Sequence, residues 1–148
     1  MINLVRTDAN NKDFKTLVAL LNADLAERDG KDHPLVRFNK IDGIKYVVLA
    51  YEDQKPLGCG AISEYDADTM EIKRVYVSPV CRGKGVATRV LAELEKWANE
   101  LSYSRCILVT GTNQPEAYAF YRKNGYSLVP NYGPVAKIED CLCFAKTM

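Results

Sequence analysis

Residues 77–88 read Val-Ser-Pro-Val-Cys-Arg-Gly-Lys-Gly-Val-Ala-Thr, and this stretch decides the fold of the chain. The alternating segment before it, residues 71–77, predicts a strand, and the segment after it predicts a long amphipathic helix. Glycine lets the main chain approach a ligand closely, and the N–H groups at a helix start attract negative charge. The two glycines and two basic residues between strand and helix therefore predict a cradle for a diphosphate.

Two common phosphate-binding loops fit this stretch poorly. A P-loop needs a glycine five residues before its Gly-Lys pair and a Ser or Thr directly after the lysine. Ser78 stands at the first of these positions and Gly85 at the second, which excludes a P-loop. A dinucleotide fingerprint needs a third glycine where Thr88 stands, so that match is incomplete.

A third pattern fits better. Residues 82–87, Arg-x-x-Gly-x-Ala, are similar to the acyl-CoA loop of the GNAT N-acetyltransferases, which reads Gln/Arg-x-x-Gly-x-Gly/Ala. Residues 71–79, Glu-Ile-Lys-Arg-Val-Tyr-Val-Ser-Pro, resemble the fourth strand of that family. Residues 114–126 resemble its Ala-x-x-x-Tyr-x-x-x-Gly-Phe/Tyr ending. The resemblance is specific from residue 71 to residue 126 and looser over the rest of the chain.

Hydrophobic periodicity and turn residues predict the order of elements. Expected strands span residues 2–6, 44–51, 57–65, 69–77, 105–110, 126–129 and 139–146. Expected helices span residues 10–28, 85–101 and 115–124, with a short helix at 33–41. This order is mixed α+β, with an antiparallel meander before residue 77. The resemblance implies the GNAT fold, a twisted mixed sheet flanked by helices and splayed between its fourth and fifth strands near Val77 and Thr110-Gly111.

The bulk composition is that of a globular protein. With 148 residues and 47% apolar side chains, the chain is expected to form one domain, residues 1–148. A net charge of +1 gives no electrostatic case for nucleic acid, and no apolar run is long enough to span a membrane. Five cysteines without a Cys-x-x-Cys pair or a signal-peptide pattern favour reduced thiols in the cytoplasm. We interpret Cys141 and Cys143 as packed on one face of a strand, and no metal is expected.

The resemblance implies acetyl-CoA as the co-substrate. Main-chain N–H groups of residues 83–88 would hold its diphosphate, and a β-carbon at position 83 or 85 would stand where phosphate oxygens approach. The pantetheine arm would pair with the unpaired main chain around Val75 and Val77, where Val75 would also polarise the thioester carbonyl. The residues assigned to the donor are Val75, Tyr76, Val77, Arg82, Gly83, Lys84, Gly85, Val86, Ala87, Thr88, Asn113, Gln114, Ala117 and Tyr121. The other interpretation of the loop is a basic turn before an ordinary helix.

One position departs from the family. GNAT proteins often have an asparagine seven residues before the tyrosine, and this asparagine binds the pantetheine arm. Gln114 stands at that position, with Asn113 beside it. Both side chains carry an amide, so the assignment between them stays open.

Two residues are expected to move protons. Tyr121 lies one helical turn after Ala117, and the family places this tyrosine beside the CoA sulfur, where it protonates the departing thiolate. Glu71 is the expected base for the acceptor amine, directly or through water. In a strand without a bulge it shares a face with Lys73 and Val75. The alternative for Tyr121 is a core tyrosine whose hydroxyl has a hydrogen-bond partner. The alternative for Glu71 is a glutamate paired with Lys73, Arg74 or solvent.

The acceptor is the least predictable part. We expect a primary amine of a small molecule or peptide, which attacks the thioester directly. Asp32, His33, Asn131 and Tyr132 are candidate lining residues of its pocket. A covalent route would need a nucleophilic cysteine, and nothing in the sequence lowers the pKa of Cys81 or Cys106, which lie in the right region.

Two rival functions use the same loop. A non-catalytic acyl-CoA-binding module, serving as a sensor or for partner docking, would need neither Tyr121 nor Glu71. A weaker alternative is a protein-modifying member of a toxin-like pair. The resemblance also admits a homodimer.

Overall fold

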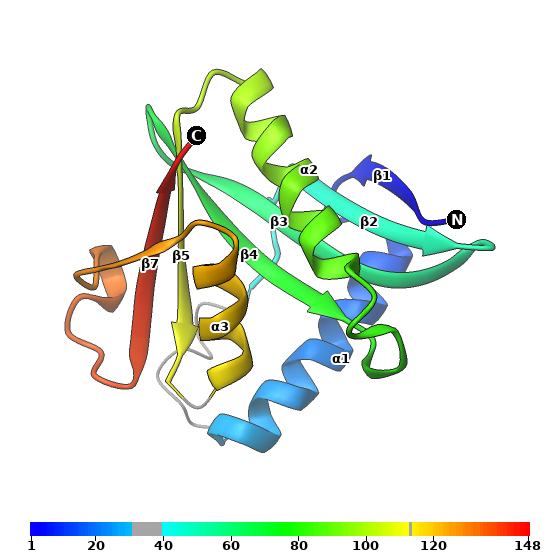
Figure 1. Cartoon of the computed structure of the whole chain (residues 1–148), viewed down its shortest axis with the longest axis horizontal. Helices are drawn as coiled ribbons and strands as arrows, with labels where there is room; N and C mark the ends of the chain where they lie inside the picture. The colour runs from blue at the N-terminus through cyan, green and yellow to red at the C-terminus, as the bar shows by residue number, and fades with distance from the viewer. Residues whose placement is uncertain (31–39, 113) are drawn as a thin grey trace.

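Seven strands form one mixed sheet within residues 1–30, 40–112 and 114–148, which the computed structural model describes (Figure 1). Their order across the sheet is β1-β2-β3-β4-β5-β7-β6. The elements along the chain are β1 (Asn3–Thr7), α1 (Lys12–Asp29), β2 (Tyr46–Glu52), β3 (Lys55–Asp66), β4 (Thr69–Val77), η2 (Pro79–Cys81), α2 (Val86–Glu100), β5 (Arg105–Gly111), α3 (Pro115–Lys123), β6 (Ser127–Val129), η3 (Gly133–Val135) and β7 (Cys141–Thr147). The order is the expected one. The short helix expected at 33–41 lies, except for its last two positions, outside the described residues.

Helix α1 covers one face of the sheet. It begins after Asn11, whose side-chain oxygen accepts hydrogen bonds from the N–H groups of Asp13 and Phe14 at 2.9 and 3.1 Å. It ends at Gly30, which has φ 86°, a conformation that favours glycine. Its apolar residues recur at helical spacing and are buried against β2, β3 and β4: Phe14, Leu17, Val18 and Leu21.

Helices α2 and α3 lie on the opposite face (Figure 1). The buried stripe of α2 consists of Val86, Val90, Leu91, Leu94 and Ala98. Two glycines of β3 make room for this stripe. A β-carbon at Gly60 would lie 2.8 Å from Leu94 Cδ1, and one at Gly58 would lie 2.8 Å from the carbonyl oxygen of Tyr76. Because these two positions carry no β-carbon, α2 packs closely on β3, and its start is held beside the end of β4.

The sheet opens between β4 and β5. These strands run parallel and pair at only three positions, Thr69 with Arg105, Met70 with Cys106 and Glu71 with Ile107. β4 continues to Val77 and β5 to Gly111 without further pairs between them. We call residues 72–77 and 108–111 the splay. Its position confirms the fold that the resemblance implies.

A β-bulge interrupts β4 within the splay. Cys59 of β3 pairs with Tyr76, whereas Ala61 pairs with Lys73, so one extra residue lies on β4. Arg74 is in the bulge, with φ 57°. Beyond it the alternation is reversed: Val75 packs with α2, and Tyr76 packs with α1. The shared face was expected only for a strand without a bulge, and the bulge places Val75 on the other side of the sheet from the Glu71–Lys73 pair.

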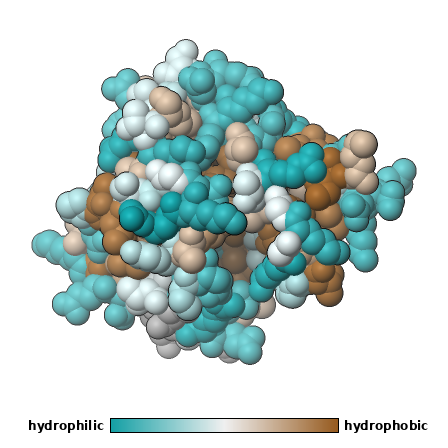
Figure 2. Space-filling view, in the orientation of Figure 1, coloured by the Kyte–Doolittle hydropathy of each residue, from teal (hydrophilic) through white to brown (hydrophobic). Residues whose placement is uncertain are grey.

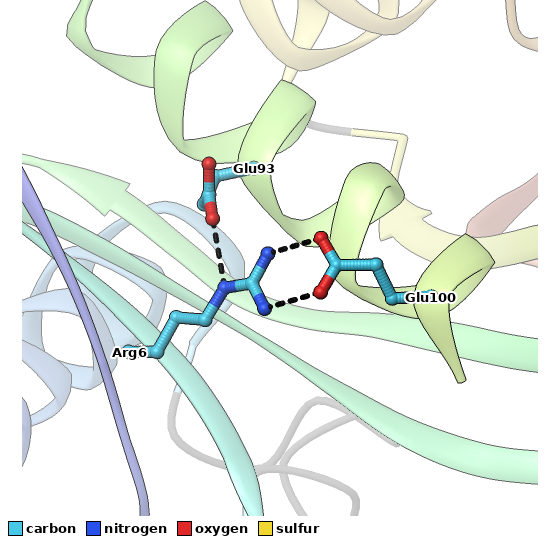
Figure 3. A network of polar contacts seen from close by, with 3 residues as sticks. All are labelled: Arg6, Glu93 and Glu100. Atoms are coloured by element: carbon cyan, nitrogen blue, oxygen red, sulfur yellow. Dashed lines mark hydrogen bonds and ion pairs between the residues drawn. The ribbon is translucent and has the colours of Figure 1, made fainter.

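An ionic network joins β1 to α2 (Figure 3). The Arg6 guanidinium donates to both carboxylate oxygens of Glu100 at 2.8 Å and to Glu93 at 2.7 Å. The same guanidinium lies 4.8 Å from the centre of the Trp97 ring. A bidentate arginine–carboxylate pair has a fixed geometry, so it orients the edge strand against the helix.

Candidate active site

The loop between β4 and α2 has the backbone that a ligand cradle requires. Gly83 and Gly85 have φ 82° and 78°, in the left-handed region that favours glycine. A β-carbon built on either residue meets no atom within 4 Å. The two glycines are therefore needed for the conformation of the main chain, and the space beside them is open to a ligand.

The start of α2 offers main-chain donors to that space. Gly85 is the N-cap, and among the described residues no side chain caps the first turn. Lys84 and Thr88 are exposed beside it and Ala87 is half-buried. Val86 is 1% exposed, so it can contribute only its main chain to a ligand. These features fit the negative diphosphate expected here.

Arg82 is held against the end of β4. Its Nε donates a hydrogen bond of 3.0 Å to the carbonyl oxygen of Val77. Its guanidinium carbon lies 5.7 Å from the centre of the Tyr76 ring. The arginine therefore brings positive charge to the point where the splay meets the loop. The side chain of Val77 is buried in the core, and that of Val75 packs against it.

Tyr121 lies on α3 with its ring in the core behind the splay. It is 8% exposed, and its ring contacts Tyr126, Phe120 and Phe144 at centroid distances of 5.0–6.0 Å. Within the described residues its hydroxyl makes no hydrogen bond. A buried hydroxyl without a partner is costly, so it fits a ligand atom that arrives later. Ala117 packs against the same core, which confirms the predicted shared face.

The charge around Tyr121 comes from the bulge. Burial raises the pKa of the Tyr121 hydroxyl above its ordinary value, and the nearby Arg74 guanidinium opposes this rise. Burial lowers the pKa of Arg74 to about 10, with Cys59 and Tyr121 acting in the opposite sense. Arg74 also donates a hydrogen bond to the Asn22 side chain of α1. The Tyr121 hydroxyl is therefore protonated at neutral pH.

Glu71 is bound by two other side chains at the closed end of the splay. Its Oε1 lies 3.3 Å from Lys73 Nζ, and its Oε2 accepts a 2.7 Å hydrogen bond from the Tyr132 hydroxyl. Tyr132 comes from the loop after β6 and packs edge-on against Tyr65, with ring centroids 5.2 Å apart. Burial, and secondly the Glu71 carboxylate, raise the pKa of Tyr132 above its ordinary value. The structure thus brings together two residues that the sequence had placed in separate groups.

A comparison with models of known protein families shows which family the chain belongs to. Residues 14–126 match the model of the Acetyltransferase (GNAT) family. The chain belongs to this family. It is 35% identical over 79 residues to an IAA acetyltransferase of Azospirillum brasilense, a match that covers 53% of this GNAT chain and 52% of that protein. The chain thus spans about half the length of that curated relative.

Solved structures show the same fold as this GNAT chain. A Klebsiella pneumoniae protein assigned to the acyl-CoA N-acyltransferases is 26% identical, with a TM-score of 0.84 and coverage of 99% of this chain and 97% of that one. The PaiA N-acetyltransferase of Thermoplasma acidophilum, solved in complex with coenzyme A, has a TM-score of 0.76 at 16% identity, with coverage of 100% and 99%. At that identity the second likeness concerns the fold.

The cysteines of this GNAT chain are all free and buried. Burial raises the pKa of Cys59 and Cys106 to about 12 and that of Cys143 to about 11, so these thiols stay protonated at neutral pH. Cys141 and Cys143 share one small core on a single face of β7, as expected. Among the described residues, no group of three or more His, Cys, Asp or Glu side chains could hold a metal ion.

The remaining predicted residues divide into two groups. Gln114 is the N-cap of α3, and Asn131 donates a 2.9 Å hydrogen bond to the carbonyl oxygen of Ile138 within its own loop. Asp32, His33 and Asn113 lie outside the described residues.

Sequence reasoning missed Arg74 as a neighbour of Tyr121. No sequence signal was available for this contact, because it depends on the bulge that the pairing of β4 with β3 creates. Along the described part of the GNAT chain, no helix is both long and apolar enough to cross a membrane.

Proposed function

We propose that this chain transfers the acetyl group of acetyl-CoA to a primary amine of a small molecule or peptide. The observation that carries the proposal is the buried hydroxyl of Tyr121, which has no partner among the described residues and lies behind a splay where β4 and β5 do not pair with each other. A pantetheine arm that pairs with β4 would place a thioester in the splay. The glycine loop directly follows β4, so it would receive the diphosphate of the same molecule.

The reaction proceeds by direct attack. The amine nitrogen forms a bond to the thioester carbon, and the main chain near Val75 stabilises the negative oxygen that develops there. The carbon–sulfur bond then breaks, and Tyr121 gives its proton to the departing thiolate. Glu71 receives the proton that the ammonium form of the acceptor loses before the attack, and the second N–H proton, which leaves once the carbon–nitrogen bond has formed, passes to solvent. The products are the N-acetyl amine and free coenzyme A, and proton exchange with solvent restores both side chains.

The burial of Cys106 supports this route over a covalent one through that thiol. An acyl-cysteine intermediate needs a thiolate beside the thioester. Cys106 is buried with its pKa raised to about 12, mainly by burial. A thiol with that pKa is almost fully protonated at pH 7 and is a weak nucleophile.

Calorimetry with coenzyme A, followed by a thiol-release screen of amines with acetyl-CoA, tests the function. We expect micromolar to millimolar binding of the donor and release of thiol that depends on one class of amine. Binding without transfer to any amine would favour a non-catalytic acyl-CoA sensor instead. No binding at all would remove the donor site from the splay and the loop.

A further inference from the structure

We propose that the Tyr132 hydroxyl relays the proton of the acceptor amine to Glu71. This inference rests on the proposed function and adds a residue to it. It concerns the closed end of the splay, where Glu71 forms the last pair between β4 and β5. The relay begins at the amine nitrogen, passes through the Tyr132 oxygen and ends at Glu71 Oε2.

Both carboxylate oxygens of Glu71 are already engaged. Oε1 lies 3.3 Å from the Lys73 ammonium, and Oε2 accepts the Tyr132 hydroxyl at 2.7 Å. The Glu71 side chain is only 18% exposed, which leaves little room for an amine to reach it directly. The Tyr132 oxygen, in contrast, donates its proton to Glu71 and retains lone pairs that accept a hydrogen bond. An amine that donates a hydrogen bond to the Tyr132 oxygen is therefore linked to the Glu71 carboxylate through this hydroxyl.

Packing holds Tyr132 in the orientation that the relay needs. Its ring lies edge-on against Tyr65, and Asn131 closes the loop by its hydrogen bond to the Ile138 carbonyl oxygen. Val135 of the same loop is buried against β7, at 4% exposed. The tyrosine belongs to the loop that follows β6 and the glutamate to β4, so their bond spans the two halves of the splayed sheet.

The proton transfer is concerted and balanced. The amine N–H bond breaks as an O–H bond forms on Tyr132, while the original Tyr132 O–H bond breaks and the proton passes to Glu71. Burial and the neighbouring carboxylate raise the pKa of Tyr132, so a free tyrosinate is disfavoured and the two transfers occur together. Tyr132 is unchanged at the end, and Glu71 is protonated.

Four variants test the relay with an amine found in the thiol-release screen. Tyr132→Phe keeps the ring and removes the hydroxyl, Glu71→Gln removes the base, and the third variant combines both changes. We expect Tyr132→Phe and Glu71→Gln each to lower kcat by about 100-fold, the usual contribution of proton transfer. The double variant should lose little more, because residues that act as a unit are not additive. Tyr65→Phe is the control, since it keeps the ring that packs edge-on against Tyr132 and removes a hydroxyl that makes no bond to Glu71.

The pH profile separates a relay from a merely structural role. As the pH rises through the pKa of the acceptor ammonium, the amine arrives already deprotonated and depends less on the relay. The loss caused by Tyr132→Phe should therefore shrink at high pH, while the affinity for acetyl-CoA stays at the wild-type value. A distorted loop would cause the same loss at every pH.

Three results would overturn the relay: a Tyr132→Phe enzyme within about threefold of wild type, additive losses in the double variant, or a loss that does not depend on pH. If the wild type acetylates an amine and one of these results is found, only the relay is wrong. If the wild type does not bind acetyl-CoA, the proposed function and the relay are both wrong.

Discussion

Glu71 of β4 and Ile107 of β5 form the last pair in the ladder that joins the two halves of the sheet. From this pair onward, the edge of β4 that faces β5 has no strand partner among the described residues. Unpaired main-chain groups need other partners, so the end of this ladder determines where an extended ligand can pair with the protein. The catalytic hypothesis places the base at this end and the diphosphate loop at the other end of β4.

Tyr121→Phe should lower turnover and leave the affinity for acetyl-CoA unchanged. The substitution keeps the ring contacts with Tyr126 and Phe144 and removes only the unpartnered hydroxyl. We expect kcat to fall by about 100-fold, as for the loss of a positioned proton donor. Steady-state kinetics and calorimetry measure the two quantities. Tyr118→Phe, on the exposed side of the same helix, is the control, and equal rates in both variants would remove Tyr121 from the mechanism.

Gly85→Asp should weaken the binding of coenzyme A strongly. The new side chain would enter the open space beside the loop and repel the diphosphate. Each lost hydrogen bond to a charged group costs about 1.5–3 kcal/mol, so affinity should fall by tenfold or more, as calorimetry would show.

Gly43→Asp is the matched control for this prediction. Gly43 has φ 80° and also has no atom within 4 Å of a built β-carbon, so the backbone strain and added charge are the same as at Gly85. It precedes β2 and therefore lies far from the loop. The opposite end of β2 is the one beside the loop, since Ala50 pairs with Gly58 of β3. Equal binding in the two variants would move the phosphate site elsewhere.

Deprotonation of Tyr121 should not lower the reaction rate below about pH 10, the ordinary pKa of tyrosine. Burial raises the pKa of Tyr121 above that value, so the proton-donating form persists as the pH rises. Rates of wild type and Tyr121→Phe would be compared across this range. A falling limb that is present in the wild type and missing from the variant would contradict the prediction.

Gly58→Ala should destabilise the fold more than Gly60→Ala. The new β-carbon at Gly58 would lie 2.8 Å from a main-chain oxygen, that of Tyr76, which cannot move without disturbing the strand. At Gly60 the nearest atoms are the side-chain tips of Val90 and Leu94, which can rotate. Overpacking costs about 1–3 kcal/mol, and urea unfolding would measure it. A larger loss at Gly60 would mean that α2 is the more rigid neighbour.

Arg6→Lys should lower the unfolding midpoint, because lysine cannot form the bidentate pair with Glu100. Hydrogen bonding from Arg6 lowers the pKa of Glu100, so its contribution is complete above the ordinary pKa of glutamate and is lost as the pH falls below it. The difference between variant and wild type should therefore shrink in acid and in high salt. Arg122→Lys, at an exposed position of α3, is the control. A difference that is constant with salt and pH would indicate lost packing on Trp97 instead.

Local sequence patterns predicted most of the elements. Three local signals lie within a few residues of the structure they determine: the apolar spacing in α1 and α2, Asp29-Gly30 at the end of α1, and Pro115 at the start of α3. The splay was predicted from the resemblance to a family, because periodicity alone does not indicate where two strands separate.

Two features of the candidate site could not be predicted in this way. The bulge at Arg74 depends on how β4 pairs with β3, and alternation along one strand does not contain that information. The bond between Tyr132 and Glu71 joins residues 61 positions apart, and only the folded sheet brings them together. Local sequence patterns propose the chemical groups, and only the tertiary structure determines which of them are neighbours.

If the chain binds acetyl-CoA as proposed, the three-pair ladder also makes the stability of the sheet depend on that donor. A ligand that binds only the folded chain raises the melting temperature with its concentration. A pantetheine arm along residues 72–77 would protect main-chain amides there from exchange with deuterated water. Between turnovers, when coenzyme A has left, the same amides would be the first in the sheet to exchange.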